Sequence, residues 1–392
     1  MSKIDDLIAQ YCPDGVERKE LKTLFKISRG RVISKDYLNA NKGIYPVYSS
    51  QTVNNGVIGS IKTFDYDGEY LSWTTDGANA GTIFYRNGKF SVTNVCGLLK
   101  VLHNEIINPK FAYYCLSINM KDYVNYGMGN PKLMSNVVEK ITIPIPPLPV
   151  QEEIVSILDK FTELEAELEA ELEARTRQYE YYRNELLSFD GKDVEWKALG
   201  EVGEFIRGSG LQKTDFQESG VGCIHYGQIY TYYGTSATET KSFVSEELAE
   251  KLRKAKKGDL VIAGVSENIE DVCKAVVWLG EEDVCISGDS WAYRHNQNPK
   301  FIGYLFQTTR FLEFKKKYAQ GAKVTRLRSG SLPTFTIPVP PIEEQERIVA
   351  ILDKFNALVN DISTGLPAEI QARRQQYEYY RGKLLTFEPL TA

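Results

Sequence analysis

Two glycine-containing stretches contain residues of the types that methyltransferases use to bind a methyl donor and the amine that receives the methyl group. They are FIRGSG at residues 205–210 and GNPKL at residues 129–133. An adenine methyltransferase needs a glycine-rich loop, whose backbone can approach S-adenosylmethionine closely, and an Asn/Asp-Pro-Pro-aromatic loop for the amine. GNPKL has one proline and no aromatic residue, and it precedes the glycine stretch instead of following it. The likeness is superficial, and a DNA adenine methyltransferase remains only as an alternative.

The acidic residues and the cysteines do not form a catalytic or metal site in the sequence. A metal-dependent nuclease needs clustered carboxylates and a lysine, whereas Asp289 stands alone and the acids of 267–271 form no such set. The cysteines show no Cys-x-x-Cys spacing and no histidine at ligand spacing, so we expect free thiols and neither zinc nor disulfides. We therefore expect no catalytic residue and no metal ligand. The cysteines are Cys12, Cys96, Cys115, Cys223, Cys273 and Cys285.

The chain is organised around long helices, which must position its functional domains. From Gln151 to about Ser188 nothing interrupts a helix, and apolar residues recur in steps of three and four as one stripe. At 1.5 Å per residue this helix would be roughly 57 Å long, and a single apolar stripe of that length needs a partner helix. We expect Pro146, Pro147 and Pro149 to lie before the helix, because proline lacks the amide N–H.

The partner is encoded by an internal repeat. Residues 337–355 match residues 143–161 at 13 of 19 positions, and RQQYEYYRGKLLTF later repeats TRQYEYYRNELLSF. A repeat of this size indicates two copies of one module, each a globular part followed by a long helix. The segments between the repeated ends diverge, as expected for two related readers of two different targets.

These patterns predict an α/β (α+β) fold with two globular domains, each followed by a long helix. The two helices should pack as an antiparallel coiled coil with pseudo-twofold internal symmetry. Gly365 and Pro367 should break the second helix. Antiparallel helices should also place Leu385 near the start of the first domain, so that the two chain ends meet. The expected boundaries are 1–148 for the first domain, 149–190 for the central helix, 191–341 for the second domain and 342–392 for the C-terminal helix.

The net charge of −5 conceals an uneven distribution. The central helix is rich in glutamate, whereas basic clusters occur at 251–257, 315–317 and 323–328. A basic face can therefore exist on an acidic protein, although each cluster could equally be ordinary solvated surface. No run of eighteen apolar residues could span a membrane, and the N-terminus lacks the apolar region of a signal peptide. We expect a cytoplasmic protein with no membrane partner.

The central helix contains the tetrad ELEA three times in succession, from Glu163 to Ala174. Four helical residues advance ~6 Å and turn ~400°, a net rotation of ~40°. One DNA base pair turns about 35°, given 10–10.5 base pairs per turn. Adding or removing one tetrad could thus re-phase two DNA readers by about one base pair. The alternative is a plain charged coiled-coil helix in a scaffold protein that does not bind DNA.

The doubled segments PIPPLPVQEEIVSILDKF and PVPPIEEQERIVAILDKF, each with a distal QYEYYR, resemble the specificity subunits of type I restriction-modification systems. The resemblance covers the entire chain. The family pattern Pro-Pro-x-x-Glu-Gln is met by Pro340, Pro341, Glu344 and Gln345. The first copy departs from it, because Val150 stands before Gln151 where the family has Glu.

The resemblance implies a non-catalytic DNA-reading subunit. Each target-recognition domain would read one half of a bipartite, asymmetric site in double-stranded DNA, and the helices would set the spacing. Two modification (methyltransferase) subunits would dock on the helices, and restriction (endonuclease and translocase) subunits would join them. No cofactor is expected on this chain, because S-adenosylmethionine, ATP and Mg would be held by the partner subunits.

Polar and basic residues on loops are the candidates for DNA contact, because their side chains match base edges and phosphates. A turn residue that satisfies its own backbone is about as good an explanation for each of them. The candidates are Ser49, Ser50, Gln51, Asn54, Asn55, Thr74, Thr75, Asp76, Asn79, Lys132, His225, Tyr226, Gln228, Ser266, Glu267, Asn268, Lys323, Arg326 and Arg328. The candidates on the subunit-docking helices are Ile154, Leu158, Phe161, Tyr179, Tyr182, Ile348, Leu352, Phe355, Tyr377 and Tyr380.

Overall fold

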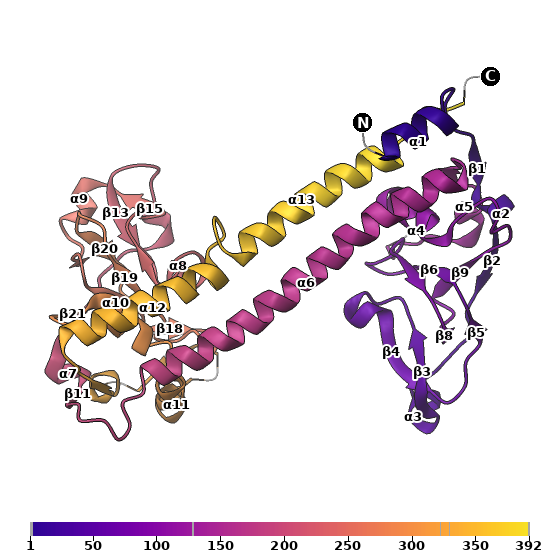
Figure 1. Ribbon diagram of the computed structural model, residues 1–392. Helices are drawn as coiled ribbons and strands as arrows, with labels where there is room; N and C mark the ends of the chain where they lie inside the picture. Colours follow the sequence, from indigo (N-terminus) through magenta and orange to yellow (C-terminus); the bar gives the residue numbers. More distant parts are fainter. Residues whose placement is uncertain (1–2, 128, 322, 329, 391–392) are drawn as a thin grey trace. The chain divides into compact units, whose positions relative to one another are not determined.

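The computed structural model describes residues 3–127, 129–321, 323–328 and 330–390. Its chain divides into two compact units, which are described separately (Figure 1). Unit 1 is Met1–Glu167 with Gln371–Ala392, and unit 2 is Leu168–Ile370. Each unit therefore combines one globular domain with helical segments from both copies of the repeat.

Unit 1 is built on two four-stranded sheets. The first has the order β2-β9-β6-β7 and is antiparallel throughout, and the second has the order β4-β3-β8-β5, with β3 and β8 parallel. A short ribbon, β1-β10, leads into the long helix. The strands are β1 (Arg18–Glu20), β2 (Phe25–Arg29), β3 (Lys42–Tyr48), β4 (Val57–Ile61), β5 (Tyr66–Asp67), β6 (Tyr70–Thr74), β7 (Ile83–Arg86), β8 (Lys89–Val92), β9 (Cys96–Val101) and β10 (Thr142–Pro144). The helices of this domain are α1 (Lys3–Tyr11), α2 (Leu21–Leu24), α3 (Lys35–Ala40), α4 (Pro109–Asn119) and α5 (Ser135–Val138), with short 3-10 turns η1 (Val53–Gly56) and η2 (Met120–Tyr123).

Unit 2 repeats this plan with additions. Its two main sheets have the orders β12-β21-β17-β19-β14 and β15-β13-β20-β16, and β13 and β20 are parallel. The ribbon β11-β24 has the same register as β1-β10: Lys197 faces Ile337 as Lys19 faces Ile143. The strands are β11 (Trp196–Ala198), β12 (Gly203–Arg207), β13 (Val221–Ile224), β14 (Ser236–Ala237), β15 (Ser242–Val244), β16 (Lys254–Ala255), β17 (Leu260–Ala263), β18 (Val265–Ser266), β19 (Ala275–Trp278), β20 (Val284–Ile286), β21 (Ser290–His295), β22 (Ala319–Gln320), β23 (Thr325–Leu327) and β24 (Thr336–Pro338). The helices are α7 (Leu199–Val202), α8 (Tyr226–Thr231), α9 (Glu246–Ala249), α10 (Pro299–Leu305) and α11 (Thr309–Tyr318), with 3-10 turns η3 (Lys213–Asp215) and η4 (Leu332–Thr334).

Three long helices carry the repeated motifs: α6 (Leu148–Leu186), α12 (Ile342–Asn360) and α13 (Leu366–Leu385). The expected break in the second helix is confirmed, because α12 ends five residues before Gly365 and α13 begins one residue after it. The expectation for Pro149 was wrong. It lies in the first turn of α6, where its missing N–H has no helical acceptor to lose.

Each globular domain is fixed to a long helix by the same set of side chains. Asp159 accepts hydrogen bonds from Tyr114 at 2.6 Å and from Lys110 at 2.5 Å, and in unit 2 Asp353 accepts them from Tyr304 and Lys300 at 2.6 and 2.8 Å. The apolar stripes pack beneath these contacts, so the helices belong to the domain cores.

The chain ends meet within unit 1, as the antiparallel arrangement of the helices predicts. Leu385 is buried in the core that also contains Ile4 and Val16. The amide of Val16 donates to the carbonyl of Glu388 at 2.9 Å, and the amide of Leu390 donates back to Val16 at 3.2 Å. Figure 1 shows α1 beside the end of α13. Residues 388–390 thus pair with Val16, two residues before β1.

Candidate nucleic-acid interface

Two groups of candidate residues, chosen independently in the two copies, occupy equivalent places. In unit 1 the parallel pair β3–β8 ends at Tyr48, opposite Val92, and in unit 2 the pair β13–β20 ends at Ile224, opposite Ile286. Ser49 and His225 are the residues that follow these ends. The loops that begin with Ser49 and with His225 are therefore the same structural feature with different side chains.

In unit 1 this feature is a tight loop, residues 49–56. The amide of Ser49 donates to the carbonyl of Gly56 at 2.9 Å, and the Gln51 side-chain amide donates to Val57 at 2.7 Å. Asn54 and Asn55 are exposed and both have φ of 51°, in the left-handed region that asparagine tolerates. Ser49, Ser50 and Gln51 are half-buried. The loop presents amides and hydroxyls, which can donate to and accept from base edges.

In unit 2 the same feature is more enclosed. His225 is buried, and its ring lies 4.3 Å from the half-buried ring of Tyr226. Burial, and next the nearby charge of Lys213, lower the pKa of His225. Gln228 is also buried and bonds to the His225 amide at 2.9 Å and the Ser242 hydroxyl at 2.7 Å. Gln228 thus stabilises the loop from the interior of the domain. Tyr226 is more accessible than His225 and Gln228.

A second pair of groups is brought together by backbone pairing in each unit. In unit 1 Asp76 forms a β-bridge with Lys132, and the amide of Leu133 donates to Thr75 at 2.8 Å. Thr74 and Thr75 are buried, whereas Asn79 and Lys132 are exposed. Segments 74–79 and 131–133, selected separately from the sequence, therefore form one surface.

Unit 2 makes the corresponding surface from β18 and β23. Ser266 pairs with Thr325, and Val265 pairs with Arg326. Ser266 is buried, but Glu267 and Asn268 beyond it are exposed. Three exposed cations gather along the partner segment, which gives this surface a positive side: Lys323, Arg326 and Arg328.

Within each unit the two surfaces adjoin. In unit 1 the hydroxyl of Thr93 donates to that of Ser49 at 3.0 Å, and the amide of Thr75 donates to the carbonyl of Val95, two residues after Thr93, at 3.0 Å. In unit 2 the amide of Tyr226 donates to the hydroxyl of Ser287 at 3.0 Å, and the amide of Gly264 donates to the carbonyl of Asp289 at 2.7 Å. Each unit thus has one polar edge formed by the ends of several strands.

Arg29 and Arg207 lie at this edge and were missed in the sequence. Both are exposed, and both are followed by a glycine that the packing requires. A Cβ on Gly30 would lie 2.1 Å from the Val92 carbonyl oxygen, and one on Gly208 would lie 2.1 Å from that of Ser287. The Arg-Gly pair that ISRG and FIRG share is the sequence signal that marks both arginines. Beside Arg207 a pocket of about 400 Å³ is lined by Lys213, His225, Tyr226 and Asp289.

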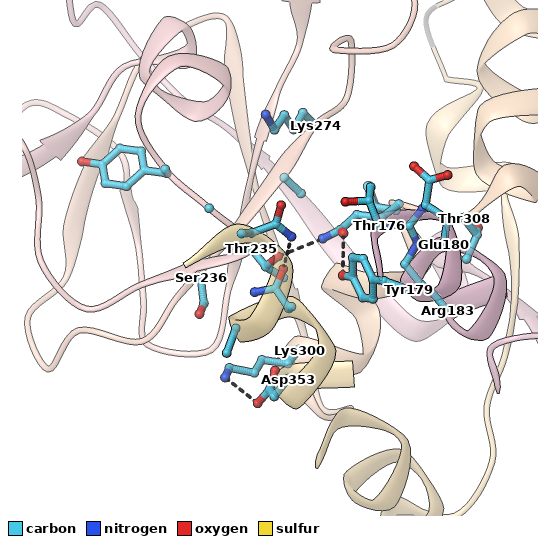
Figure 2. Close-up of a pocket in the computed structure, with 18 of the residues that line it drawn as sticks. Thr176, Tyr179, Glu180, Arg183, Thr235, Ser236, Lys274, Lys300, Thr308 and Asp353 are labelled. Atoms are coloured by element: carbon cyan, nitrogen blue, oxygen red, sulfur yellow. Dashed lines mark hydrogen bonds and ion pairs between the residues drawn. The ribbon is translucent and has the colours of Figure 1, made fainter. Parts of the chain in front are cut away.

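A larger pocket of about 960 Å³ lies within unit 2, between the end of α6, α12 and residues 232–236 (Figure 2). Its walls carry both signs of charge, including the Lys300–Asp353 pair at 2.8 Å. Arg183 lies over the ring of Tyr179, 5.0 Å from its centroid. Among the residues that the structure describes, no three His, Cys, Asp or Glu side chains are placed to hold a metal ion. The six cysteines are buried and free.

The docking-helix candidates divide into two kinds. The aromatic candidates Tyr182 and Tyr380 are each 39% exposed, and Phe161, Phe355 and Tyr377 are half-buried. The other five are buried within their own units. These are Ile154, Leu158, Tyr179, Ile348 and Leu352.

The fold and its duplicated polar edge define a class of protein with two related recognition domains on shared helices. A family model described as the type I restriction modification DNA specificity domain matches the chain twice, at residues 13–174 and 191–372. The chain belongs to this family and is a non-catalytic DNA specificity subunit with two target-recognition domains. No helix in the described part of the chain is long and apolar enough to cross a membrane.

Individual relatives agree with this assignment. A putative type I specificity subunit of Mycoplasma pneumoniae is 32% identical over 93% of this chain and 96% of its own length. The EcoR124I/EcoR124II specificity subunit of Escherichia coli is 34% identical over 71% of this chain and 70% of its own. The S subunit of M. genitalium has the same fold, with a TM-score of 0.58 at 16% identity over 94% of this chain and 96% of that one. A chain from a structural study of type I complex assembly gives a TM-score of 0.61 at 16% identity, over 95% and 98%.

Proposed function

We propose that each unit reads one half of a bipartite DNA site through its polar edge. The observation that carries this proposal is the equivalence of the two edges. The position directly after β3 and β13 carries Ser49 in one unit and His225 in the other, and the last position of β2 and β12 carries Arg29 and Arg207. Equal frames with different side chains suit two readers of two different half-sites, because base edges are distinguished by side-chain donors and acceptors.

The helices would set the spacing between the half-sites and dock two modification subunits, and restriction subunits would join that core. The exposed aromatic residues of the QYEYYR motifs, Tyr181 and Tyr379, are 63% and 65% exposed and suit such docking. We propose no cofactor on this chain, with S-adenosylmethionine, ATP and Mg held by the partners. Its DNA target would place the complex in the cytoplasm. Neither the methyltransferase nor the scaffold alternative gains support from the relatives.

A methylation map tests the proposal directly. We expect adenine methylation at a split motif only in cells that contain both this chain and its modification subunit. Arg29→Ala should weaken recognition of the first half-site, and Arg207→Ala should weaken recognition of the second half-site. Lys19→Ala, on the β1 ribbon and ion-paired to Glu17, is the matched control. Methylation by this chain alone would support the enzyme alternative, and equal effects of both arginine variants on both halves would contradict the two-reader proposal.

A further inference from the structure

Arg86, the last residue of β7, is a buried cation that the DNA edge does not by itself explain. Only 2% of its surface is exposed. Burial lowers its pKa, but an arginine side chain stays protonated in proteins. No ion pair to Arg86 exists in the part of the chain that the structure describes. A buried charge without a counter-ion is costly, so its retention calls for a compensating role.

The guanidinium has few partners. Its Nε donates to the hydroxyl of Ser72 at 3.0 Å, and Ser72 is itself buried. Its central carbon lies 3.7 Å from the ring centroid of Tyr48 and 4.3 Å from that of Phe84, distances typical of cation–π contacts. One terminal nitrogen, Nη1, is buried and has no hydrogen-bond partner. The charge is therefore stabilised by aromatic faces and by the polar groups of Ser72 and Tyr48, and Nη1 remains without a partner.

The other terminal nitrogen lies beneath loop 49–56. A Cβ placed on Gly56 would be 3.2 Å from Nη2 of Arg86 and 3.1 Å from the carbonyl oxygen of Gln51. Gly56 has φ of +81° and follows the left-handed Asn54 and Asn55. Glycine adopts this region readily, but two consecutive asparagines in it form a sparsely populated backbone arrangement that surrounding structure must hold in place. Arg86 lies where such support is needed.

Unit 2 shows that the fold does not require a cation at this position. The registers of β6 with β7 and β9, and of β17 with β19 and β21, make Trp278 the counterpart of Arg86 and Val261 the counterpart of Ser72. Both belong to an apolar cluster in unit 2. The same frame thus holds either an apolar pair or Arg86 with Ser72. The loop above differs too, since His225 begins it in unit 2 and Ser49 begins it in unit 1.

We infer that Arg86 is a positioning residue of the first target-recognition domain: its guanidinium supports loop 49–56 from beneath in the conformation that reads DNA. This inference rests on the proposed function. Arg86 need not touch DNA. It acts through Ser49, Gln51 and the two asparagines, whose donors and acceptors depend on the loop's shape. Its uncompensated charge also adds positive potential directly below a loop that must approach phosphates.

The test compares methylation maps and thermal unfolding for the full chain in complex with its modification subunit. Arg86→Met removes the charge and the donors at similar length. We expect selectivity at the first half-site to fall about tenfold or more, the size expected on losing a charged hydrogen-bonding group, with the second half-site unchanged. Arg86→Lys should restore part of that selectivity. Tyr85→Phe, on the same strand, is the matched control and should leave both halves unchanged.

If Arg86→Met does not fold, Ser72→Ala keeps the charge and removes the acceptor of Nε, so a smaller change confined to the first half-site is expected. A folded Arg86→Met complex with an unaltered first half-site would overturn the inference. Equal losses at both halves that follow the fall in melting temperature would also overturn it, because they would show a role in stability alone. A wild-type complex without a split motif would instead reject the proposed function.

Discussion

The ring of Phe161 stacks on the ring of Tyr380, with centroids 5.7 Å apart and planes inclined by 26°. Phe161 ends the LDKF motif of the first repeat, and Tyr380 belongs to the QYEYYR motif of the second. The reciprocal pair, Phe355 with Tyr182, stacks at 5.5 Å and 27° within unit 2. Each repeat therefore supplies half of the aromatic contact in each unit, which explains why both motifs occur twice.

Replacing Phe161 by alanine should lower the free energy of unfolding of unit 1 by about 2 kcal/mol, less than for a fully buried phenylalanine. Tyr380→Ala should cost a similar amount. The double variant should reveal a coupling of about 1 kcal/mol, the usual size for a stacked aromatic pair. Denaturant unfolding of the four proteins measures this cycle. Tyr126→Ala, at a site 68% exposed in the same unit, should have little effect, and additive losses would mean that the rings do not interact.

Gln151→Leu should destabilise unit 1 by about 2–4 kcal/mol, because it leaves buried backbone groups unpaired. Gln151 accepts from the amide of Asn108 at 2.8 Å and donates to the carbonyls of Ile106 and Pro146 at 2.8 and 2.7 Å. Leucine has a similar volume, so lost packing should contribute little to the fall in the free energy of unfolding.

The same change at Gln345, which bonds to the Asn298 amide and the Pro340 carbonyl at 3.0 and 2.8 Å, should destabilise unit 2 comparably. Thermal unfolding checks both variants. Glu152→Gln changes the next residue of α6, which is exposed, and serves as the control. A melting temperature unchanged in Gln151→Leu would show that water or a backbone shift satisfies the orphaned groups.

The helices and the meeting of the chain ends could be predicted because they depend on local periodicity and on the repeat itself. The burial of the loop residues could not be predicted from the sequence. Thr75 and Ser266 resemble ordinary turn residues in the sequence, but backbone pairing with Leu133 and with Thr325, each about sixty residues away, places both inside the domain. Arg29 was missed for a similar reason, since only tertiary structure pairs it with Gly97 of β9 and brings its side chain to Met134 and Ser135. Such partners are chosen by tertiary contacts, which no local pattern reports.

Unit 2 should lose stability as the pH falls below 6.5. Burial lowers the pKa of His295 to about 4, against the attraction of nearby Asp259, and its buried Nε2 has no partner. Between pH 6.5 and about 4, His295 binds a proton in the unfolded chain but stays neutral in the folded chain. Stability is therefore complete above pH 6.5 and falls with acidification by at most about 1.4 kcal/mol per pH unit.

Unfolding of the wild type and of His295→Gln across pH 4–7 measures this dependence. The variant should lose most of the slope, and any remainder belongs to His225, whose pKa is also lowered, and to carboxylates. Equal slopes in the wild type and the variant would contradict the assignment.

Deleting the tetrad Glu167–Ala170 should change the spacer between the two half-sites by about one base pair and leave both half-sites unaltered. The deletion removes ~6 Å and a net ~40° from α6, and the rotation is close to the ~35° of one base-pair step. The tetrads lie inside one uninterrupted helix, so the change is not absorbed by a loop. Glu167→Gln with Glu169→Gln keeps the length and should keep the spacer, which separates an effect of length from one of charge. Methylation mapping of both variants decides the matter: an unchanged spacer in the deletion variant, or altered half-sites, would show that the helix does not act as the ruler between the two readers.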